Sequence, residues 1–196
     1  MIDFQKAKQY VFNLLGSDLS KDFIYHDIQH TLDVYQSATR LGTMAKLSES
    51  ELLLLQTAAL FHDVGLIYGE DKHEAVAAEI VREILPEYGY SEEDIVVINQ
   101  MIMATKLPQA PHTKLDELLC DADLGYLGRD DFFLLAAKLH LEWKRMGIHE
   151  MDFDRWIIFE RDFMKSHQYF TAEARKLNDE GKKNNLRQLL KIGCPQ

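Results

Sequence analysis

Cysteine is scarce in this chain of 196 residues, which contains only Cys120 and Cys194. Two cysteines so far apart form neither the disulfide framework of a small secreted protein nor the paired spacing of a zinc finger. The sequence therefore suits a protein of a reducing compartment.

An excess of positive charge is also missing. Lys and Arg number 22 against 32 Asp and Glu, which gives a formal net charge of −10 at pH 7. Proteins that mainly grip phosphate backbones are usually basic, so we expect no nucleic-acid partner. A small phosphorylated substrate remains compatible with this composition, because it needs only a few local cations or a metal.

Long apolar stretches are lacking as well. No window reaches the roughly 18 consecutive apolar residues of a membrane span, and the N-terminal MIDFQKAKQYVF lacks the apolar stretch of a signal peptide. We therefore expect no membrane partner and a cytoplasmic location. The oligomeric state stays open, and a homodimer is compatible with the sequence.

Patterns typical of β-strands and internal repeats are nearly absent, whereas helical periodicity recurs. Predicted helices lie at about 3–16, 27–46, 48–63, 72–85, 91–106, 130–146, 152–177 and 183–192, and a short helical segment that starts at Thr113 carries LLCDADLGYLG. Start signals precede three of them, at Ser48 with Glu51, Ser91 with Asp94 and Thr113 with Asp116. We expect an all-α fold, a single helical bundle over residues 1–196, with a motif-bearing core at 25–128 and C-terminal helices at 129–192 that complete it.

The stretch TAALFHDVG, at 57–65, closes a helix that is apolar on nearly every side. Such a helix belongs in a core, yet its last turn carries His62 and Asp63. A buried carboxylate is costly unless it is paired or coordinates a metal, and a helix C-terminus carries partial negative charge that disfavours it further. A hydrogen-bonded His–Asp pair is one explanation, and a metal ion explains both residues together.

The stretch YHDIQHTLDV, at 25–34, places His26 and His30 four residues apart. On a helix they share one face, with Cβ atoms about 5–6 Å apart. This spacing is compatible with two surface histidines and equally with two histidines that serve one site.

The stretch CDADLGYLG, at 120–128, embeds Asp121 and Asp123 among leucines. Carboxylates in apolar surroundings need a partner. The alternative is a polar helix edge with both carboxylates in water.

In order, these stretches read H…HD…D, which resembles the HD superfamily of metal-dependent phosphohydrolases. YHDIQHTLDV is similar to the YHNxxHxxDV segment of cyclic-nucleotide phosphodiesterases, FHDVG to the HD signature, and ADLGYLG to the segment that supplies the last aspartate. The resemblance implies that His30, His62, Asp63 and Asp123 bind a divalent metal. Mixed nitrogen and carboxylate ligands suit Mn, Fe, Ni or Zn, or Mg with more water.

The resemblance also assigns roles around the metal. His26 stands where the phosphodiesterases protonate the leaving oxygen, and His73 resembles the histidine that approaches the substrate phosphate or a second metal. Asp63 or His73 would hold the attacking water, and Asp121 would orient a metal ligand by hydrogen bonding. These roles imply hydrolysis of a phosphoester bond in a nucleotide or a similar small phosphorylated metabolite.

One segment departs from the family pattern. Where many two-metal members carry another histidine, this chain has MIMATKLPQ, with Thr105 and Lys106. His112 follows in a proline-flanked loop. Lys106 either contacts a substrate phosphate or is solvated, and a complete two-metal site is in doubt.

Two other functions remain open at this point. An HD-type di-iron oxygenase would need His73 and His112 to complete its ligands, and a non-catalytic nucleotide sensor would not need His26. We expect the aromatic residues of the segment 153–170 to pack in the core rather than to form a wall for a base.

Overall fold

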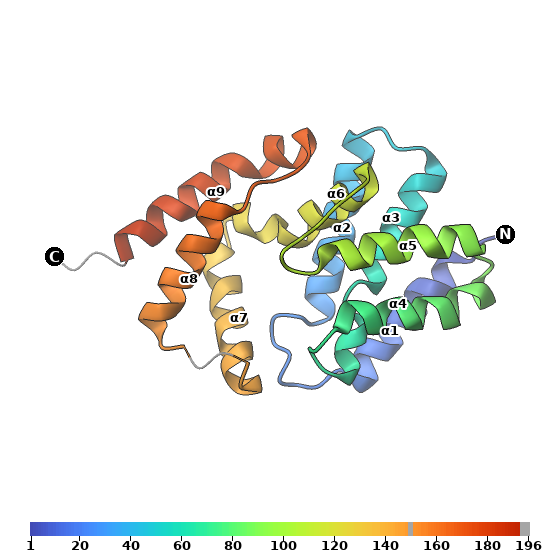
Figure 1. The fold of residues 1–196 in the computed structure, drawn as a ribbon, viewed down its shortest axis with the longest axis horizontal. Helices are drawn as coiled ribbons and strands as arrows, with labels where there is room; N and C mark the ends of the chain where they lie inside the picture. Colours follow the sequence, from blue (N-terminus) through green and yellow to red (C-terminus); the bar gives the residue numbers. More distant parts are fainter. Residues whose placement is uncertain (149–150, 193–196) are drawn as a thin grey trace.

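The computed structural model describes residues 1–148 and 151–192. Over these ranges the chain folds into nine α-helices, three short 3-10 helices and no β-strand. Figure 1 shows their arrangement. The α-helices are α1 (Phe4–Asp18), α2 (Ile28–Met44), α3 (Glu49–Phe61), α4 (His73–Ile84), α5 (Glu92–Thr105), α6 (Lys114–Asp123), α7 (Phe132–Met146), α8 (Phe153–Ser166) and α9 (Ala172–Ile192), and the 3-10 helices are η1 (Val64–Tyr68), η2 (Leu85–Tyr88) and η3 (Leu124–Gly128). The all-α prediction is confirmed.

The three predicted start signals are capping boxes in the structure. In each, the side chain of the N-cap residue accepts a hydrogen bond from the backbone N–H three positions later, and the acidic side chain there accepts one from the N-cap N–H. Two backbone donors that a helix start would leave unpaired are thereby satisfied. These boxes fix the starts of α3, α5 and α6.

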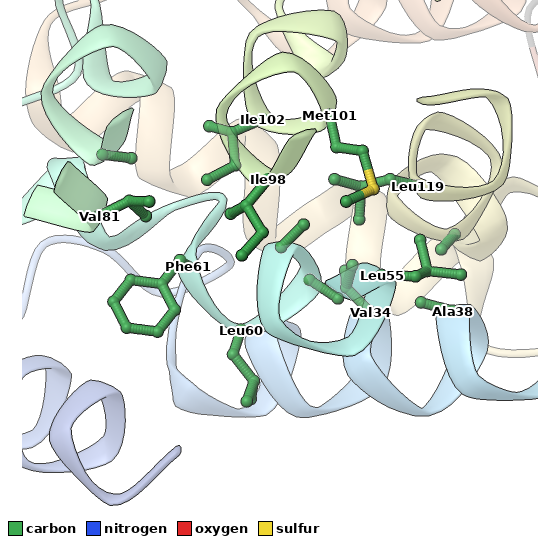
Figure 2. Close-up of a cluster of buried hydrophobic side chains, with 14 of the residues drawn as sticks. Val34, Ala38, Leu55, Leu60, Phe61, Val81, Ile98, Met101, Ile102 and Leu119 are labelled. Carbon is green, nitrogen blue, oxygen red and sulfur yellow. The ribbon is translucent and has the colours of Figure 1, made fainter. Parts of the chain in front are cut away.

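Helix α3 lies at the centre of the main core, as its sequence predicts. Its residues Leu55, Leu60 and Phe61 are fully buried. Figure 2 shows them packed between side chains of α2, α4, α5 and α6. The C-terminal half of α3 is therefore surrounded by protein, and it leads to buried His62 and to Asp63, which lines a cavity.

Helix α3 with η1 also corrects the sequence-based expectation about membrane-length segments. The window Glu49–Tyr68 spans 20 residues with a mean hydropathy of 1.2, enough by length and composition to cross a membrane. In the structure 61% of this window is buried inside the protein. The apolar character of the segment is explained by its central place in the core.

A second cluster of buried side chains lies beside the first. It gathers residues of α7, α8, α9 and η3, with Trp156 and Phe132 among the largest. In Figure 1 these three helices form one side of the molecule, next to the group made by α1 to α6. The candidate site described below lies where residues from both groups meet.

The prediction of one helix at about 152–177 is wrong. Helix α8 ends at Ser166, and α9 starts at Ala172 and continues without a break through the separate helix predicted at about 183–192. The carboxylate of Asp121 causes the interruption. It accepts hydrogen bonds from the backbone N–H groups of Phe170 and Thr171, at 2.8 Å each, and from the Thr171 hydroxyl at 2.6 Å.

The role expected for Asp121 is therefore also corrected. Its hydrogen bonds reach the turn between α8 and α9, and its side chain is fully buried there. Burial raises the pKa of this carboxyl, and the hydrogen bonds from residues 170 and 171 oppose that shift. Asp121 anchors the C-terminal helices to α6.

Gly65 permits a close approach between η1 and α4. A Cβ atom at this position would lie 2.0 Å from the carbonyl oxygen of His73 and 2.9 Å from the nitrogen of Ala77, and both contacts are with backbone. No side chain fits there. The glycine after the His–Asp pair therefore lets α4 bring His73 next to Asp63.

Candidate metal centre

Four side chains converge from three helix ends. His62 is the C-cap of α3 and Asp63 precedes η1, while His30 comes from the first turn of α2 and Asp123 from the last turn of α6. The N-cap of α2, Asp27, accepts a hydrogen bond from the backbone N–H of His30 at 3.0 Å. Local capping thus sets where His30 begins its helix and which way it faces.

The donor atoms of these residues lie close together. His30 Nε2 is 3.3 Å from His62 Nε2, 3.3 Å from Asp63 Oδ2 and 3.4 Å from Asp123 Oδ1. His62 Nε2 is 3.1 Å from Asp63 Oδ2 and 3.7 Å from Asp123 Oδ1. Ligands at about 2.1 Å from one ion lie about 3.0–3.4 Å from each other in octahedral or tetrahedral geometry. The cluster therefore has the dimensions of a single metal site.

The hydrogen bonding of the cluster fits a metal as well. Asp63 Oδ2 is buried and lacks a hydrogen-bond partner within the described residues. His62 Nδ1 lies 2.9 Å from the carbonyl oxygen of Ala59, so Nδ1 carries the proton and donates it there. This leaves the lone pair of Nε2 directed at the cluster, which is how a metal-binding histidine is usually held. A divalent ion would satisfy both the orphaned oxygen and this lone pair.

Without an ion, the histidines and carboxylates of the cluster shift one another's pKa values. Burial lowers the pKa of His30, but the neighbouring carboxylates of Asp123 and Asp63 outweigh it and raise that pKa to about 9. Burial raises the pKa of the Asp63 carboxyl, yet His62 and His30 hold it well below its ordinary value. The carboxylates are therefore ionised at neutral pH, as metal ligands must be.

His73 lies on the other side of Asp63. Its Nε2 is 3.5 Å from Asp63 Oδ1, and its Nδ1 lies 3.0 Å from the carbonyl oxygen of Glu70. Asp63 thus presents Oδ2 to the cluster and Oδ1 to His73. The structure brings His73 to the site, where its Nε2 lies between Asp63 Oδ1 and Glu74 Oε1, the latter at 3.6 Å.

His26 also lies at the site, and its partner escaped sequence analysis. The ring Nδ1 of His26 is 2.5 Å from Glu142 Oε1, while Glu142 Oε2 accepts hydrogen bonds from the backbone N–H groups of Tyr25 and His26 at 2.8 and 3.0 Å. Glu142 belongs to α7 and is 1% exposed. The hydrogen bonds from His26 and Tyr25 hold the pKa of Glu142 below its ordinary value against the effect of burial.

Helical spacing could have identified Glu142. It continues the buried face of α7 formed by Phe132, Ala136 and Leu139, with steps of three or four residues. A carboxylate on an apolar face needs a partner, and His26 is that partner. Glu142 was not singled out from the sequence.

A cavity of about 570 Å³ opens from the cluster. Asp63, His73, His26 and Asp123 line one part of it. Exposed Lys72 and Lys106 also line it, and Thr105 lies beside Lys106 with its hydroxyl donated to the carbonyl oxygen of Ile102. Lys106 is therefore placed at the cavity, whereas the residues that line it do not include His112.

The opposite part of the cavity is aromatic, which corrects the expectation that segment 153–170 belongs entirely to the core. Trp156 and Tyr169 are buried, but Phe159 and Phe163 line the cavity together with Trp143. Phe153 is exposed and does not belong to the core either. Glu160, next to Phe159, lines the same cavity and was not singled out from the sequence.

Comparison with known proteins places this geometry in a family. A model of the HD domain matches residues 27–145. A curated protein of Clostridium beijerinckii, described as uncharacterized, is 36% identical over 104 residues, which cover 48% of this chain and 64% of that protein. The chain thus spans less than two thirds of the length of that relative.

Two crystal structures share the fold. One, described as a predicted HD superfamily hydrolase from an uncultured Thermotogales bacterium, matches with a TM-score of 0.65 and 18% identity over 96% of this chain and 90% of that one. The other, from Lactobacillus plantarum, matches with a TM-score of 0.71 and 16% identity over 98% of this chain and 97% of that one. With the family model matched over more than half of its length and the His and Asp residues gathered at one centre, the chain belongs to the HD-domain family.

Proposed function

We propose that this protein is a metal-dependent phosphohydrolase that cleaves a phosphoester bond in a nucleotide or a similar small phosphorylated metabolite. The observation that carries the proposal is the convergence of His30, His62, Asp63 and Asp123 at the inner end of a cavity that His26 also lines. One cavity thus offers a place for a metal and a separate acid–base group.

His30, His62, Asp63 and Asp123 would hold the ion. When bound, a divalent metal supplies two things that phosphoester hydrolysis needs: a water of lowered pKa and compensation for negative charge on the phosphoryl oxygens. The ring of His73, fixed through its Nδ1, would hold a water against Asp63 Oδ1.

His26 is suited to protonate the departing oxygen. Glu142 accepts a hydrogen bond from Nδ1, which fixes the ring and leaves Nε2 for the substrate. This pair works like the His–carboxylate pairs of other hydrolases, in which the carboxylate orients the ring and stabilises the imidazolium. Lys72 and Lys106 add positive charge at the cavity, where the substrate phosphate would enter.

A second candidate rests on a specific distance. His73 Nε2 lies 3.5 Å from Asp63 Oδ1, so Asp63 can bridge two ions. A di-iron oxygenase of this family type would use such a pair. Thr105 and Lys106 oppose it, because neither supplies the further ligand that a second tight ion requires, and the charge of Lys106 repels cations.

The test is turnover by purified protein supplied in turn with Mn²⁺, Fe²⁺, Ni²⁺, Zn²⁺ and Mg²⁺. A panel of nucleotides and simple phosphoesters is offered, and the products are separated by chromatography. We expect metal-dependent hydrolysis that Asp63→Ala abolishes. Absence of hydrolysis with every metal would contradict the proposal. Oxygen consumption with iron would support the oxygenase, and tight nucleotide binding without products would indicate a sensor.

A further inference from the structure

Glu160 is a buried carboxyl group that the proposed mechanism does not use. It lies on the buried face of α8, between Trp156 and Met164, and is 1% exposed. Its Oε2 has no hydrogen-bond partner among residues 1–148 and 151–192. It nevertheless lines the cavity that contains Asp63 and Asp123. A buried polar atom without a partner needs an explanation, and a ligand in the cavity is one.

The surroundings of Glu160 make the lack of a partner costly. Burial raises its pKa to about 7, and no neighbouring cation opposes this shift. Two buried phenols, those of Tyr25 and Tyr126, are close enough that the charge of Glu160 raises their pKa values further. Nothing in the described part of the chain compensates an ionised Glu160, so the group is either protonated or paired with a bound molecule that donates hydrogen bonds to it.

The side chains next to Glu160 form an apolar wall of the cavity. Phe159 and Phe163 stand one turn apart on α8 with their rings nearly parallel, at 8° and 6.3 Å between centroids. Trp143 of α7 meets Phe159 at 64° and 5.4 Å. Phe159 is 36% exposed and lies next to Ile158, which is 48% exposed. Such rings suit a flat aromatic ligand, because each offers a face on which it can stack.

We propose that the cavity binds a guanine nucleotide, with the carboxylate of Glu160 accepting hydrogen bonds from the ring N1–H and the 2-amino group of the base while the base packs on Phe159 and Phe163. The proposal rests on the phosphohydrolase function and names the substrate class of that same site. The phosphate end then points toward the metal centre, past Lys72 and Lys106.

The donor and acceptor pattern selects guanine. A carboxylate only accepts hydrogen bonds, and its two oxygens match two parallel N–H donors. Among the common bases, guanine presents two adjacent donors on one edge. Adenine and cytosine pair an amino group with a ring nitrogen that accepts, and uracil flanks its single N–H with two carbonyl oxygens. These three leave one oxygen of Glu160 facing a lone pair or without a partner.

The size of the cavity is consistent with this placement. At about 570 Å³ it lies within the roughly 300–1,000 Å³ typical of small-molecule sites, and it extends from Asp63 and Asp123 to Phe163. A mononucleotide combines a base with a phosphate, and the lining of the cavity combines aromatic side chains with Asp63 and Asp123.

The test measures binding, independently of turnover, by titration calorimetry on the intact protein with Mn²⁺. Guanosine, inosine and adenosine monophosphates are compared, since inosine lacks only the 2-amino group. We expect guanosine monophosphate to bind roughly tenfold to a hundredfold more tightly than adenosine monophosphate, with inosine monophosphate between them. In Glu160→Gln the preference for guanine should largely disappear. Asp162→Asn, which removes an exposed carboxylate from the same helix, should keep it.

Two other outcomes would contradict the inference, and a third would separate it from the proposed function. Equal affinities of the wild-type protein for the three nucleotides would overturn it, even if Glu160→Gln failed to fold. A preference for adenosine monophosphate would mean that Glu160 binds as a protonated acid, and guanine would be excluded. Selective guanine binding without hydrolysis of any phosphoester would support this inference and contradict the proposed function, so the two can fail separately.

Discussion

Glu142 Oε1 lies 2.5 Å from His26 Nδ1, although the two residues are separated by 116 positions in the chain. This contact links α7 to the segment before α2, and it gives His26 a fixed ring orientation.

We predict that His26 serves the chemistry and not the metal. His26→Ala should retain bound metal and lose turnover by roughly 10²–10⁴-fold, the usual contribution of a general acid. Glu142→Gln should also retain metal, with kcat lowered by roughly 10–100-fold, because an amide holds the ring of His26 less firmly than the carboxylate does. Elemental analysis beside steady-state kinetics decides. Loss of metal in step with activity would make His26 a ligand.

We predict that Asp63 is required for metal binding. Asp63→Ala should lose most of the bound metal, because Asp63 Oδ2 lies within 3.3 Å of both His30 Nε2 and His62 Nε2. The wild-type protein should also melt at a lower temperature after chelation, since the metal binds the folded state alone. Asp162→Asn serves as the control. Equal metal content in Asp63→Ala and wild-type protein would refute the ligand assignment.

We predict one tightly bound metal. The cluster of His30, His62, Asp63 and Asp123 is complete by itself, whereas a second ion would depend on His73 and a bridging Asp63. Titration with Mn²⁺, followed by electron-spin resonance, should give one tight equivalent without substrate. His73→Ala should keep that equivalent and lower turnover. Two tight equivalents, or the coupled signal of a metal pair, would favour the two-metal alternative.

Glu160 should make stability depend on pH. Its pKa rises from the ordinary value of 4.5 to about 7 in the folded protein, so between these values the unfolded chain releases a proton that the folded chain retains. The folded state therefore loses stability as pH rises through this window, by about 3 kcal/mol in total, and the loss levels off above it. Urea unfolding from pH 4.5 to 8 should show that Glu160→Gln removes this decrease. Parallel curves for the two proteins would contradict the prediction.

Gly65 should tolerate no side chain. In Gly65→Ala the new methyl group meets the carbonyl oxygen of His73, and relieving that contact displaces α4. We expect a loss of several kcal/mol in unfolding free energy and impaired turnover through His73. Gly16→Ala is the matched control, because its Cβ would meet only Ile28 Cδ1, at 3.8 Å. Equal stability of the two variants would show that η1 and α4 can separate without cost.

Local signals explain how far the sequence alone could predict this fold. The capping boxes at Ser48 and Ser91 are contained within four residues each, and the apolar run of α3 required burial, so these elements followed from short stretches of sequence. The break after Ser166 did not, because it depends on Asp121, which is about 50 residues away. Contacts that remote leave no trace in helical periodicity.

The residues of the candidate site also fall into two groups, those that a short stretch of sequence reveals and those that it does not. His30 and the His62–Asp63 pair stand in recognisable stretches, and the structure brings them together. Glu142 and Glu160 stand alone in charged helices and become meaningful only when their faces are known to be buried. Both sit at helical spacing among apolar residues, so a search for carboxylates on apolar faces could have identified them.

Asp121 accepts hydrogen bonds from the backbone N–H groups of residues 170 and 171, so helix α6 has two separate functions. One short stretch of α6 supplies a metal-site carboxylate, Asp123, and two residues earlier anchors the turn that joins α8 to α9. Side chains on the cavity face of α8 can therefore be exchanged while that anchor keeps the helix in register with the metal centre. Related chains with different residues at 159, 160 and 163 are expected to accept different substrates around an unchanged reactive centre.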